Sequence, residues 1–195
     1  MSDVAYFKTL YQDEDPFGYR TRWYEARKRA LTLASLPRQR FERGWEVGCS
    51  NGVLTAELAE RCDSLLATDL DADAVEAARA MTARHSHVQL QQARHPEEWP
   101  PGTFDLILLG EVGYYLDEPD MQRTAERLHG SLDAGGVLIA CHWRQSFEQA
   151  RCTAGFVHAQ LDGWLPRLFS YRDADFLLEG WSSDITSVAQ REGLR

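Results

Sequence analysis

The chain has 195 residues, and its 21 Lys and Arg against 30 Asp and Glu give a formal net charge of −9 at pH 7. This length suits one domain, and a composition of 44% hydrophobic and 11% aromatic residues is that of a globular protein rather than a disordered one. The acidic balance argues against a protein whose main ligand is nucleic acid, because phosphate binding needs clustered Lys and Arg. A cationic ligand is compatible with it.

Two helical segments are expected first, over Val4–Tyr11 and Tyr19–Leu36, with a break at Asp15-Pro16 between them and Pro37 after them. We interpret residues 1–40 as an N-terminal helical cap and residues 41–195 as the core, in one domain overall. Within the core, β-type runs alternate with helical patterns, which is typical of a parallel sheet covered by helices.

The first five strands are expected over Gly44–Val47, Leu65–Asp69, Val88–Ala93, Phe104–Gly110 and Val137–Trp143. Helical spacing of apolar residues predicts the helices between them, over Gly52–Arg61, Asp73–Arg84 and Pro119–Leu132. After Trp143 the pattern changes to a helix over Gly155–Leu165 and two strands, Leu168–Tyr171 and Asp175–Trp181. A polar turn at Arg172-Asp173 joins this last pair, so we expect it to be antiparallel.

Cysteine and histidine spacing predicts neither disulfides nor a metal site. The four cysteines form no Cys-x-x-Cys pair, which favours free thiols in a reducing compartment, and the six histidines show no His-x-x-x-His pair. The N-terminus lacks a basic stretch followed by an apolar one, and the longest strongly apolar run, Leu106–Leu109, is far too short to span a bilayer. We therefore expect a soluble, cytoplasmic protein with no membrane span and no nucleic-acid partner.

The most informative segment is the turn Glu46-Val47-Gly48-Cys49-Ser50-Asn51-Gly52, between the first strand and the first core helix. Glycines at 48 and 52 allow a tight turn and a close approach of ligand to backbone. A pyrophosphate-binding G-x-G-x-x-G turn would need glycine where Ser50 stands, so the turn favours a ligand without phosphate.

An acidic residue follows at a telling distance, because Asp69 ends the second strand 23 residues after Glu46. A carboxylate there is placed to hold both hydroxyls of a ribose. Adenosine without phosphate beside an acidic turn points to S-adenosylmethionine, whose sulfonium and ammonium are cationic. The alternative is structural, since any strand–helix turn can carry Gly-x-x-x-Gly and strands often end in Asp.

Over residues 41–182 the chain resembles the class I S-adenosylmethionine-dependent methyltransferases, whose acidic first motif is similar to Glu46–Gly52. The resemblance implies a three-layer α/β sandwich with a seven-stranded, mostly parallel Rossmann-like sheet whose last strand is antiparallel. It also implies cofactor-binding roles for Glu46, Gly48, Cys49, Gly52, Asp69, Leu70, Arg94 and His95. Many members have Asp or Asn where Arg94 stands; because a guanidinium accepts no hydrogen bond, we expect a backbone carbonyl to take the adenine amino group.

A narrower resemblance is to the NodS group of nodulation N-methyltransferases. It rests on Tyr6-Phe7, Tyr11, Asp15-Pro16-Phe17-Gly18-Tyr19-Arg20, Trp23-Tyr24-Glu25-Ala26-Arg27-Lys28, Gly110-Glu111-Val112-Gly113-Tyr114-Tyr115 and Cys141-His142-Trp143-Arg144. This group implies methylation of the free amine on a deacetylated amino-sugar oligosaccharide, with S-adenosylhomocysteine as the product of the cofactor.

The acceptor is expected beyond the carboxyl ends of the strands, where ligands of open α/β sheets bind. We expect Glu111, Tyr115 and His142 to act in catalysis, with Glu111 also beside the cofactor. The residues expected to bind the acceptor are Tyr19, Tyr114, Trp143 and His158. The alternatives are a solvated loop acid for Glu111, loop packing for the tyrosines and a structural role for His142.

Tyr19, Trp23 and Arg27 recur every four residues, which places them on one helix face. We expect Trp23 to cover the cofactor as part of a lid; the alternative is an amphipathic helix that docks through its aromatic residues.

The leading hypothesis is thus an S-adenosylmethionine-dependent methyltransferase for an amine, with an amino sugar or oligosaccharide as its partner. One alternative is a methyltransferase for a small hydroxyl or carboxylate acceptor, and another is a cofactor-binding regulator without catalysis. A nicotinamide dehydrogenase is disfavoured by Ser50 in the glycine turn. The sequence does not indicate an oligomeric state.

Overall fold

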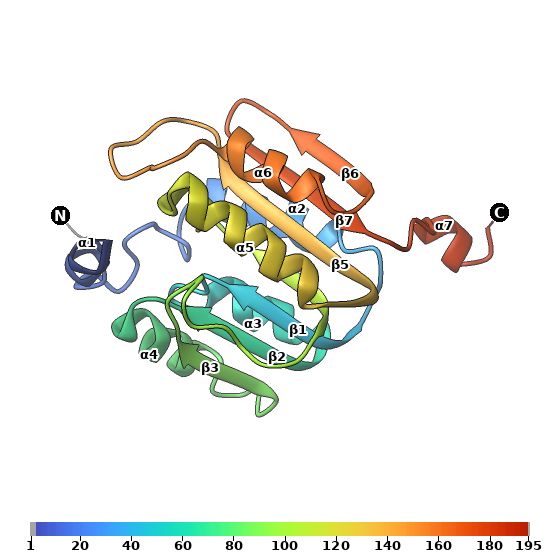
Figure 1. Cartoon of the computed structure of the whole chain (residues 1–195). Helices are drawn as coiled ribbons and strands as arrows, with labels where there is room; N and C mark the ends of the chain where they lie inside the picture. The colour runs from blue at the N-terminus through green and yellow to red at the C-terminus, as the bar shows by residue number, and fades with distance from the viewer. Residues whose placement is uncertain (1–2, 195) are drawn as a thin grey trace.

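The computed structural model describes residues 3–194 and contains one seven-stranded sheet (Figure 1). The helices are α1 (Asp3–Leu10), α2 (Trp23–Ala34), α3 (Val53–Ala59), α4 (Ala72–Met81), α5 (Glu118–Gly130), α6 (Ala154–Asp162) and α7 (Val188–Arg191), with a 3₁₀ turn, η1 (Gly113–Tyr115). The strands are β1 (Phe41–Val47), β2 (Cys62–Asp69), β3 (Val88–Gln92), β4 (Phe104–Leu109), β5 (Leu132–Trp143), β6 (Arg167–Arg172) and β7 (Phe176–Ser182).

The strand order is β3-β2-β1-β4-β5-β7-β6. Strands β3, β2, β1, β4 and β5 pair in parallel, whereas β7 pairs antiparallel with both β5 and β6. The predicted fold class is confirmed: the sheet is mostly parallel, and its last strand is the antiparallel one.

Helices cover both faces of the sheet, as Figure 1 shows with α5 and α6 in front of it and α2 and α3 behind. Strand β4 shows how the two cores form, because successive side chains of a strand point to opposite faces. Ile107 and Leu109 pack with Met121 of α5 in one core, while Leu106 and Leu108 pack with Leu58 of α3 in the other. The strand is therefore apolar on both faces from Leu106 to Leu109, as expected of a central parallel strand.

The element order matches the sequence prediction, and the differences lie at the boundaries. Strands β1 and β2 begin three residues before the predicted starts, because two exposed polar residues at the second and third positions of each strand interrupt the apolar pattern. Strand β5 begins at Leu132, which pairs with Phe104 ahead of a shift in register. The short helix α7 was not predicted.

The predicted helix over Tyr19–Leu36 starts late, since α2 begins at Trp23. The carboxylate of Asp15 accepts hydrogen bonds from the backbone N–H groups of Tyr19 (2.8 Å) and Arg20 (3.1 Å), and Gly18 has φ +73°. These interactions hold the segment in turns. Tyr19 therefore precedes the helix, and the prediction that Tyr19 and Trp23 share one helix face was wrong.

Whether residues 1–40 form a separate cap stays a prediction. Leu31 and Leu33 of α2 pack against the buried cluster that contains Leu58, so this helix contributes to the core.

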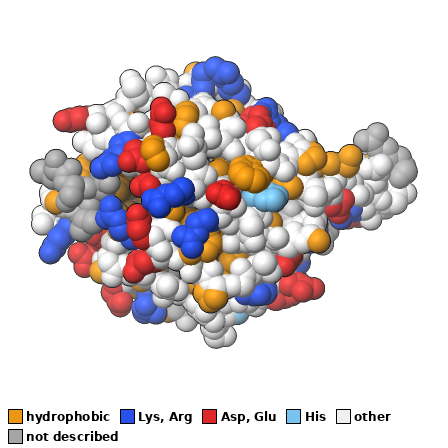
Figure 2. Space-filling view, in the orientation of Figure 1, with side chains coloured by type: hydrophobic (Ala, Val, Ile, Leu, Met, Phe, Trp, Pro, Cys, Tyr) orange, Lys and Arg blue, Asp and Glu red, His pale blue; other side chains and the backbone are white. Residues whose placement is uncertain are grey.

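Among residues 3–194, no helix is both long enough and apolar enough to cross a membrane. On the face drawn in Figure 2, basic and acidic side chains are intermingled.

Gly52, at the start of α3, packs closely against α4, and its substitution tests this packing. Its φ is +78°, and a Cβ on it would lie 2.6 Å from the Cα of Ala78 in α4. We expect Gly52→Ala to lower the free energy of unfolding by about 2 kcal/mol or more, because it adds both backbone strain and a backbone clash.

Gly130→Ala is the matched control, since a Cβ there meets no atom within 4 Å and Gly130 ends helix α5. We expect it to change the free energy of unfolding by no more than about 1 kcal/mol. Urea unfolding of both variants measures the difference, and equal stabilities would contradict the packing argument.

Candidate active site

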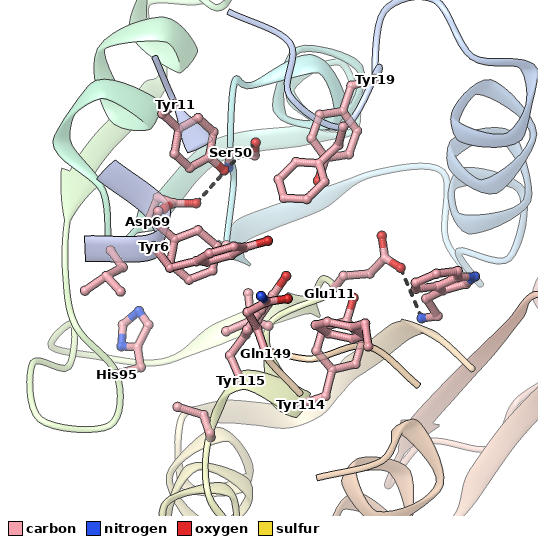
Figure 3. Close-up of a pocket in the computed structure, with 18 of the residues that line it drawn as sticks. Tyr6, Tyr11, Tyr19, Ser50, Asp69, His95, Glu111, Tyr114, Tyr115 and Gln149 are labelled. Atoms are coloured by element: carbon pink, nitrogen blue, oxygen red, sulfur yellow. Dashed lines mark hydrogen bonds between the residues drawn. The ribbon is translucent and has the colours of Figure 1, made fainter. Parts of the chain in front are cut away.

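A cavity of about 530 Å³ opens at the edge of the sheet where β1, β2, β4 and β5 end. The segment before β1 supplies one wall: Tyr6, Phe7, Tyr11, Phe17, Tyr19, Arg22, Tyr24 and Glu25. The strand ends and the loops after them supply Gly48, Ser50, Asp69, Leu70, Ala93, Arg94, His95, Glu111, Val112, Tyr114, Tyr115, Leu116, Trp143, Phe147, Gln149 and Asp175. In Figure 3, Asp69 and His95 lie at one end of the cavity, and Glu111 and Tyr114 at the other.

A smaller cavity of about 60 Å³ adjoins the first, since both are lined by Tyr19, Glu25, Gly48, Ser50 and Glu111. Its remaining lining residues come from α2, the glycine turn, α3 and the ends of β4 and β5: Lys28, Arg29, Thr32, Glu46, Cys49, Asn51, Val53, Leu54, Leu108, Gly110 and Cys141.

The turn after β1 leaves its backbone bare toward the larger cavity. Gly48 has φ +82°, and a Cβ on it would lie 2.0 Å from Cγ2 of Val112, so no side chain fits there. Ser50 also has a positive φ, of 48°, and its backbone N–H donates to Oδ2 of Asp69 at 2.8 Å. The Tyr11 hydroxyl donates to Oγ of Ser50 at 2.7 Å, which connects the N-terminal wall to the turn.

Asp69 ends β2 with its carboxylate on the cavity wall. Its Oδ1 accepts the backbone N–H of Asp71 at 3.1 Å, as its Oδ2 accepts that of Ser50. Each oxygen of a carboxylate has a second lone pair, so two further hydroxyl groups can donate to this side chain. Burial raises the pKa of Asp69 to about 6.

His95 is fixed at the same end of the cavity by hydrogen bonds to both ring nitrogens. Its Nδ1 lies 2.7 Å from the carbonyl oxygen of Glu98, so Nδ1 carries the proton, and its Nε2 lies 3.0 Å from Oγ1 of Thr68. Burial lowers the pKa of His95, which keeps the ring neutral. Arg94 is exposed, with its side chain 3.8 Å from a carboxylate oxygen of Glu97.

Glu46 is a buried carboxylate with an unsatisfied oxygen. Its side chain is 2% exposed, it lines the smaller cavity, and its Oε2 has no hydrogen-bond partner. Burial raises the pKa of Glu46 to about 8. A buried acceptor without a partner is costly, and a ligand ammonium would satisfy it.

Two carboxylates share one buried ammonium where the two cavities meet. Nζ of Lys28 donates to Oε1 of Glu25 at 3.1 Å and to Oε2 of Glu111. Oε1 of Glu111 accepts the backbone N–H of Trp143 at 3.0 Å, which ties the end of β4 to the end of β5. Burial disfavours the charged ammonium, but the charges of Glu111 and Glu25 outweigh that effect and raise the pKa of Lys28.

Aromatic rings surround Glu111 on the side away from Asp69 (Figure 3). The Tyr114 ring lies edge-on to Tyr115 at 5.1 Å and to Phe147 at 4.9 Å between centroids, and Phe147 stacks with Trp143 at 6.1 Å. Burial raises the pKa of Tyr114 and of Tyr115, so both hydroxyls stay protonated and can donate a hydrogen bond.

Most of the residues predicted for the site line one of the two cavities. Ten line the larger one: Tyr19, Gly48, Asp69, Leu70, Arg94, His95, Glu111, Tyr114, Tyr115 and Trp143. Glu46 and Cys49 line the smaller one. Gly52 lines neither cavity; its left-handed backbone forms the N-terminal end of α3.

The structure does not bring His142, His158 or Trp23 to either cavity. His142 is 0% and His158 2% exposed, and the two rings hydrogen-bond each other behind the Tyr114 ring. In this packing an acceptor in the cavity reaches neither ring, so the structure does not support proton transfer by His142 or acceptor binding by His158. The indole of Trp23 is 78% exposed at the first position of α2 and lines neither cavity.

Several cavity residues were missed by reasoning from the sequence. Tyr6, Phe7, Tyr11 and Phe17 form the wall for which Trp23 was proposed, and the density of aromatic residues in a short N-terminal segment was the available signal. Glu25 and Lys28 were also missed, because charged residues three apart on a helix usually face solvent. Phe147, Gln149 and Asp175 lie in loops without a recognisable pattern.

No group of three or more His, Cys, Asp or Glu side chains within residues 3–194 is arranged to hold a metal ion. The four cysteines are free thiols, three of them buried.

Comparison with known proteins decides the family. A family model described as a methyltransferase domain matches residues 45–138. A solved structure from Pseudomonas syringae, described provisionally as a methyltransferase, is 48% identical over 83% of this chain and 99% of its own, with a TM-score of 0.74. The chain belongs to the class I S-adenosylmethionine-dependent methyltransferases.

Relatives within this methyltransferase family include nodulation protein S. That protein from Rhizobium tropici is 29% identical over 128 residues, which are 65% of this chain and 54% of the relative. The one from Bradyrhizobium diazoefficiens is 30% identical over 65% of this chain and 61% of its own length. The chain therefore spans little more than half the length of these curated relatives.

The N-methyltransferase NodS from Bradyrhizobium japonicum WM9, solved with S-adenosylhomocysteine, shares the fold, with a TM-score of 0.82 at 23% identity over 91% of this chain and 96% of its own. S-adenosylmethionine is the cofactor of the family, and the residues at the sheet edge fit it. Asp69 has lone pairs for two ribose hydroxyls, Gly48 leaves room for the methionine arm, and Glu46 has an unpaired oxygen for its ammonium. Lys28 and Arg29 line the smaller cavity and offer positive charge to its carboxylate.

Glu46 is expected to favour ligand binding at the expense of stability. Its pKa in the folded chain, about 8, lies above the ordinary value of 4.5, so the proton on Glu46 stabilises the fold. This stabilisation is complete below about pH 4.5 and is lost as the pH rises to 8. Relative to wild type, Glu46→Gln should therefore gain roughly 2–4 kcal/mol of unfolding free energy between pH 5 and pH 8.

Urea unfolding of both proteins at the two pH values measures this gain. The same variant should bind S-adenosylhomocysteine about 10- to 100-fold more weakly at pH 8, because a charge-assisted hydrogen bond is lost. Parallel stability profiles, or an unchanged calorimetric affinity, would contradict the role given to Glu46.

Proposed function

We propose that this chain transfers the methyl group of S-adenosylmethionine to the amine of an amino sugar or of an amino-sugar oligosaccharide. The observation that carries the proposal is the cluster of Glu25, Lys28 and Glu111 beside the cavity. Two acidic side chains share one ammonium in this cluster, so acidic groups outnumber basic ones where the acceptor would enter. The similarity to nodulation protein S supports the same class of reaction.

The charge of the cavity favours an amine over an acid. Four carboxylate residues line the larger cavity, namely Glu25, Asp69, Glu111 and Asp175, against the two guanidinium groups of Arg22 and Arg94. A cationic amino sugar is attracted to such a cavity, whereas a carboxylate acceptor is repelled from its Glu111 end.

The aromatic rings near Glu111 suit a sugar. Trp143 and Phe147 stack with an interplanar angle of 29°, and Tyr114 and Tyr115 present hydroxyls beside them. A sugar ring offers C–H faces to aromatic surfaces and hydroxyls to hydrogen-bonding groups, so a wall with both properties can hold and orient it.

The chemistry asks the protein mainly for positioning. When bound, the cofactor supplies an electrophilic methyl group on its sulfonium, and the acceptor amine must present a neutral lone pair in line with the bond that breaks. Glu111 can take part because each of its oxygens accepts one hydrogen bond, from Trp143 and from Lys28, and keeps a second lone pair. It orients the amine, accepts its proton and stabilises the ammonium that forms.

Transfer of labelled methyl from S-adenosylmethionine to a panel of acceptors tests the proposal. Deacetylated chitooligosaccharides should be labelled, and their N-acetylated counterparts, which have the same rings without a free amine, should not. Trans-aconitate belongs in the panel because a trans-aconitate 2-methyltransferase from Deinococcus radiodurans is 29% identical over 67% of this chain and 51% of its own length. Label on trans-aconitate or on small phenols, with none on the amines, would overturn the proposal.

Glu111→Gln examines the carboxylate itself. The amide oxygen can still accept the Trp143 N–H, but the charge and the proton acceptor are lost. We expect kcat/KM for the amine to fall by about 100-fold or more, while the affinity for S-adenosylhomocysteine changes less than about threefold.

The matched control is Glu126→Gln, which removes one charge from an exposed position of α5 and should leave both measurements unchanged. An equal loss of cofactor affinity and of kcat/KM in Glu111→Gln would indicate that Glu111 serves the cofactor and not the acceptor.

A further inference from the structure

Behind the acceptor wall, four groups form an unbroken line of hydrogen bonds. The Gly113 N–H donates to Nε2 of His142 at 3.1 Å, Nδ1 of His142 lies 3.1 Å from Nε2 of His158, and Nδ1 of His158 lies 2.8 Å from Oε2 of Glu179. His142, His158 and Glu179 are at most 3% exposed. The line runs from η1 through β5 and α6 to β7, and neither histidine reaches a cavity.

The end at Gly113 determines the protonation of both rings. A backbone N–H only donates, so Nε2 of His142 must accept and the proton of that ring lies on Nδ1. That Nδ1–H donates to His158, whose Nε2 must then accept, which places the proton of His158 on Nδ1. Burial lowers the pKa of His142 well below its usual value, in keeping with a neutral ring.

The end at Glu179 requires the same direction. Although burial opposes it, hydrogen bonds from His158 and Ser170 hold the pKa of Glu179 below its usual range, so its carboxylate only accepts. Oε1 is taken by the Ser170 hydroxyl at 2.6 Å and by Arg167 at 2.9 Å, which leaves Oε2 for the Nδ1–H of His158. The two ends agree independently on one arrangement of protons.

We propose that His142, His158 and Glu179 are positioning residues that hold the acceptor wall through the amide of Gly113. Gly113 begins η1, which carries Tyr114 and Tyr115, and the Tyr114 ring packs edge-on against His142 at 5.2 Å between centroids. A Cβ on Gly113 would lie 3.0 Å from Nε2 of His142 and 2.6 Å from Cγ1 of Val157 in α6, so η1 packs directly against the first of these groups. The assignment of Tyr114 and Tyr115 to the acceptor rests on the proposed function, whereas the hydrogen bonds that hold Gly113 do not depend on it.

Nitrogen NMR of the histidine rings tests the arrangement in the wild-type protein without any variant. Both His142 and His158 should be neutral and protonated at Nδ1. A spectrum that shows His142 protonated at Nε2, or charged near pH 7, would overturn the proposal.

Glu179→Gln should reverse the line from its far end. Arg167 can only donate, so the new amide turns its oxygen to Arg167 and its NH₂ to His158. His158 then carries its proton on Nε2, His142 must do the same, and the N–H of Gly113 faces a second donor. We expect hydrogen exchange at the Gly113 amide to become at least about tenfold faster, since it loses its acceptor.

In the same variant, kcat/KM for the amine acceptor should fall by about tenfold through loss of positioning, while the affinity for S-adenosylhomocysteine changes less than about twofold. Glu126→Gln again serves as the charge-matched control, with wild-type values expected throughout. Unchanged Gly113 exchange and unchanged kcat/KM in Glu179→Gln would overturn the proposal. If no amine in the panel is methylated, the proposed function fails, but the ring tautomers and the Gly113 exchange still decide whether the line of hydrogen bonds positions η1.

Discussion

A concentration of carboxyl groups at one edge of the sheet is the constraint on which the site depends. Glu25, Glu46, Asp69 and Glu111 all lie at this edge, and within residues 3–194 Lys28 is the cation that pairs with Glu25 and Glu111 there. Burial raises the pKa of Glu25, Glu46 and Asp69, which shows that their charged forms are costly to bury. A ligand with a sulfonium and an ammonium would offset that cost, so we propose that the same groups that weaken the fold favour the cofactor.

The edge can hold these groups because of how the sheet is built. Parallel strands place their carboxyl ends side by side, and the turn at Gly48 and the bonds from Asp69 keep the backbone open between them. The N-terminal segment then closes the cavity, with Tyr11 bonded to Ser50 and Lys28 bonded to Glu111. The first forty residues thus contact the site at both its ends, so their removal would affect cofactor and acceptor together.

Residues within the regular fold were the ones that the sequence could place. The carboxyl end of an apolar strand is a fixed location in a parallel sheet, so the strand pattern alone assigns Asp69, Glu111 and Trp143 to the edge. The aromatic wall from Tyr6 to Phe17 could not be assigned, because its position depends on how a segment of turns folds back over the sheet. Trp23 shows the same limit, since the turns before it end in a helix that begins at this residue and leaves its indole exposed to solvent.

His142 illustrates a different limit, because its location on a strand was right and its direction was not. Side chains of β5 alternate between the two faces of the sheet, and His142 lies on the side of Tyr114 and α6, whereas Cys141 lies on the side of the smaller cavity. A histidine at a strand end has a pKa suited to proton transfer only while water or a ligand can reach it. Here both ring nitrogens are occupied by partners that fix one tautomer, so the ring can orient its neighbours but has no free nitrogen for the acceptor. In the reaction proposed above, the proton of the amine therefore leaves on the cavity side, which Glu111 lines.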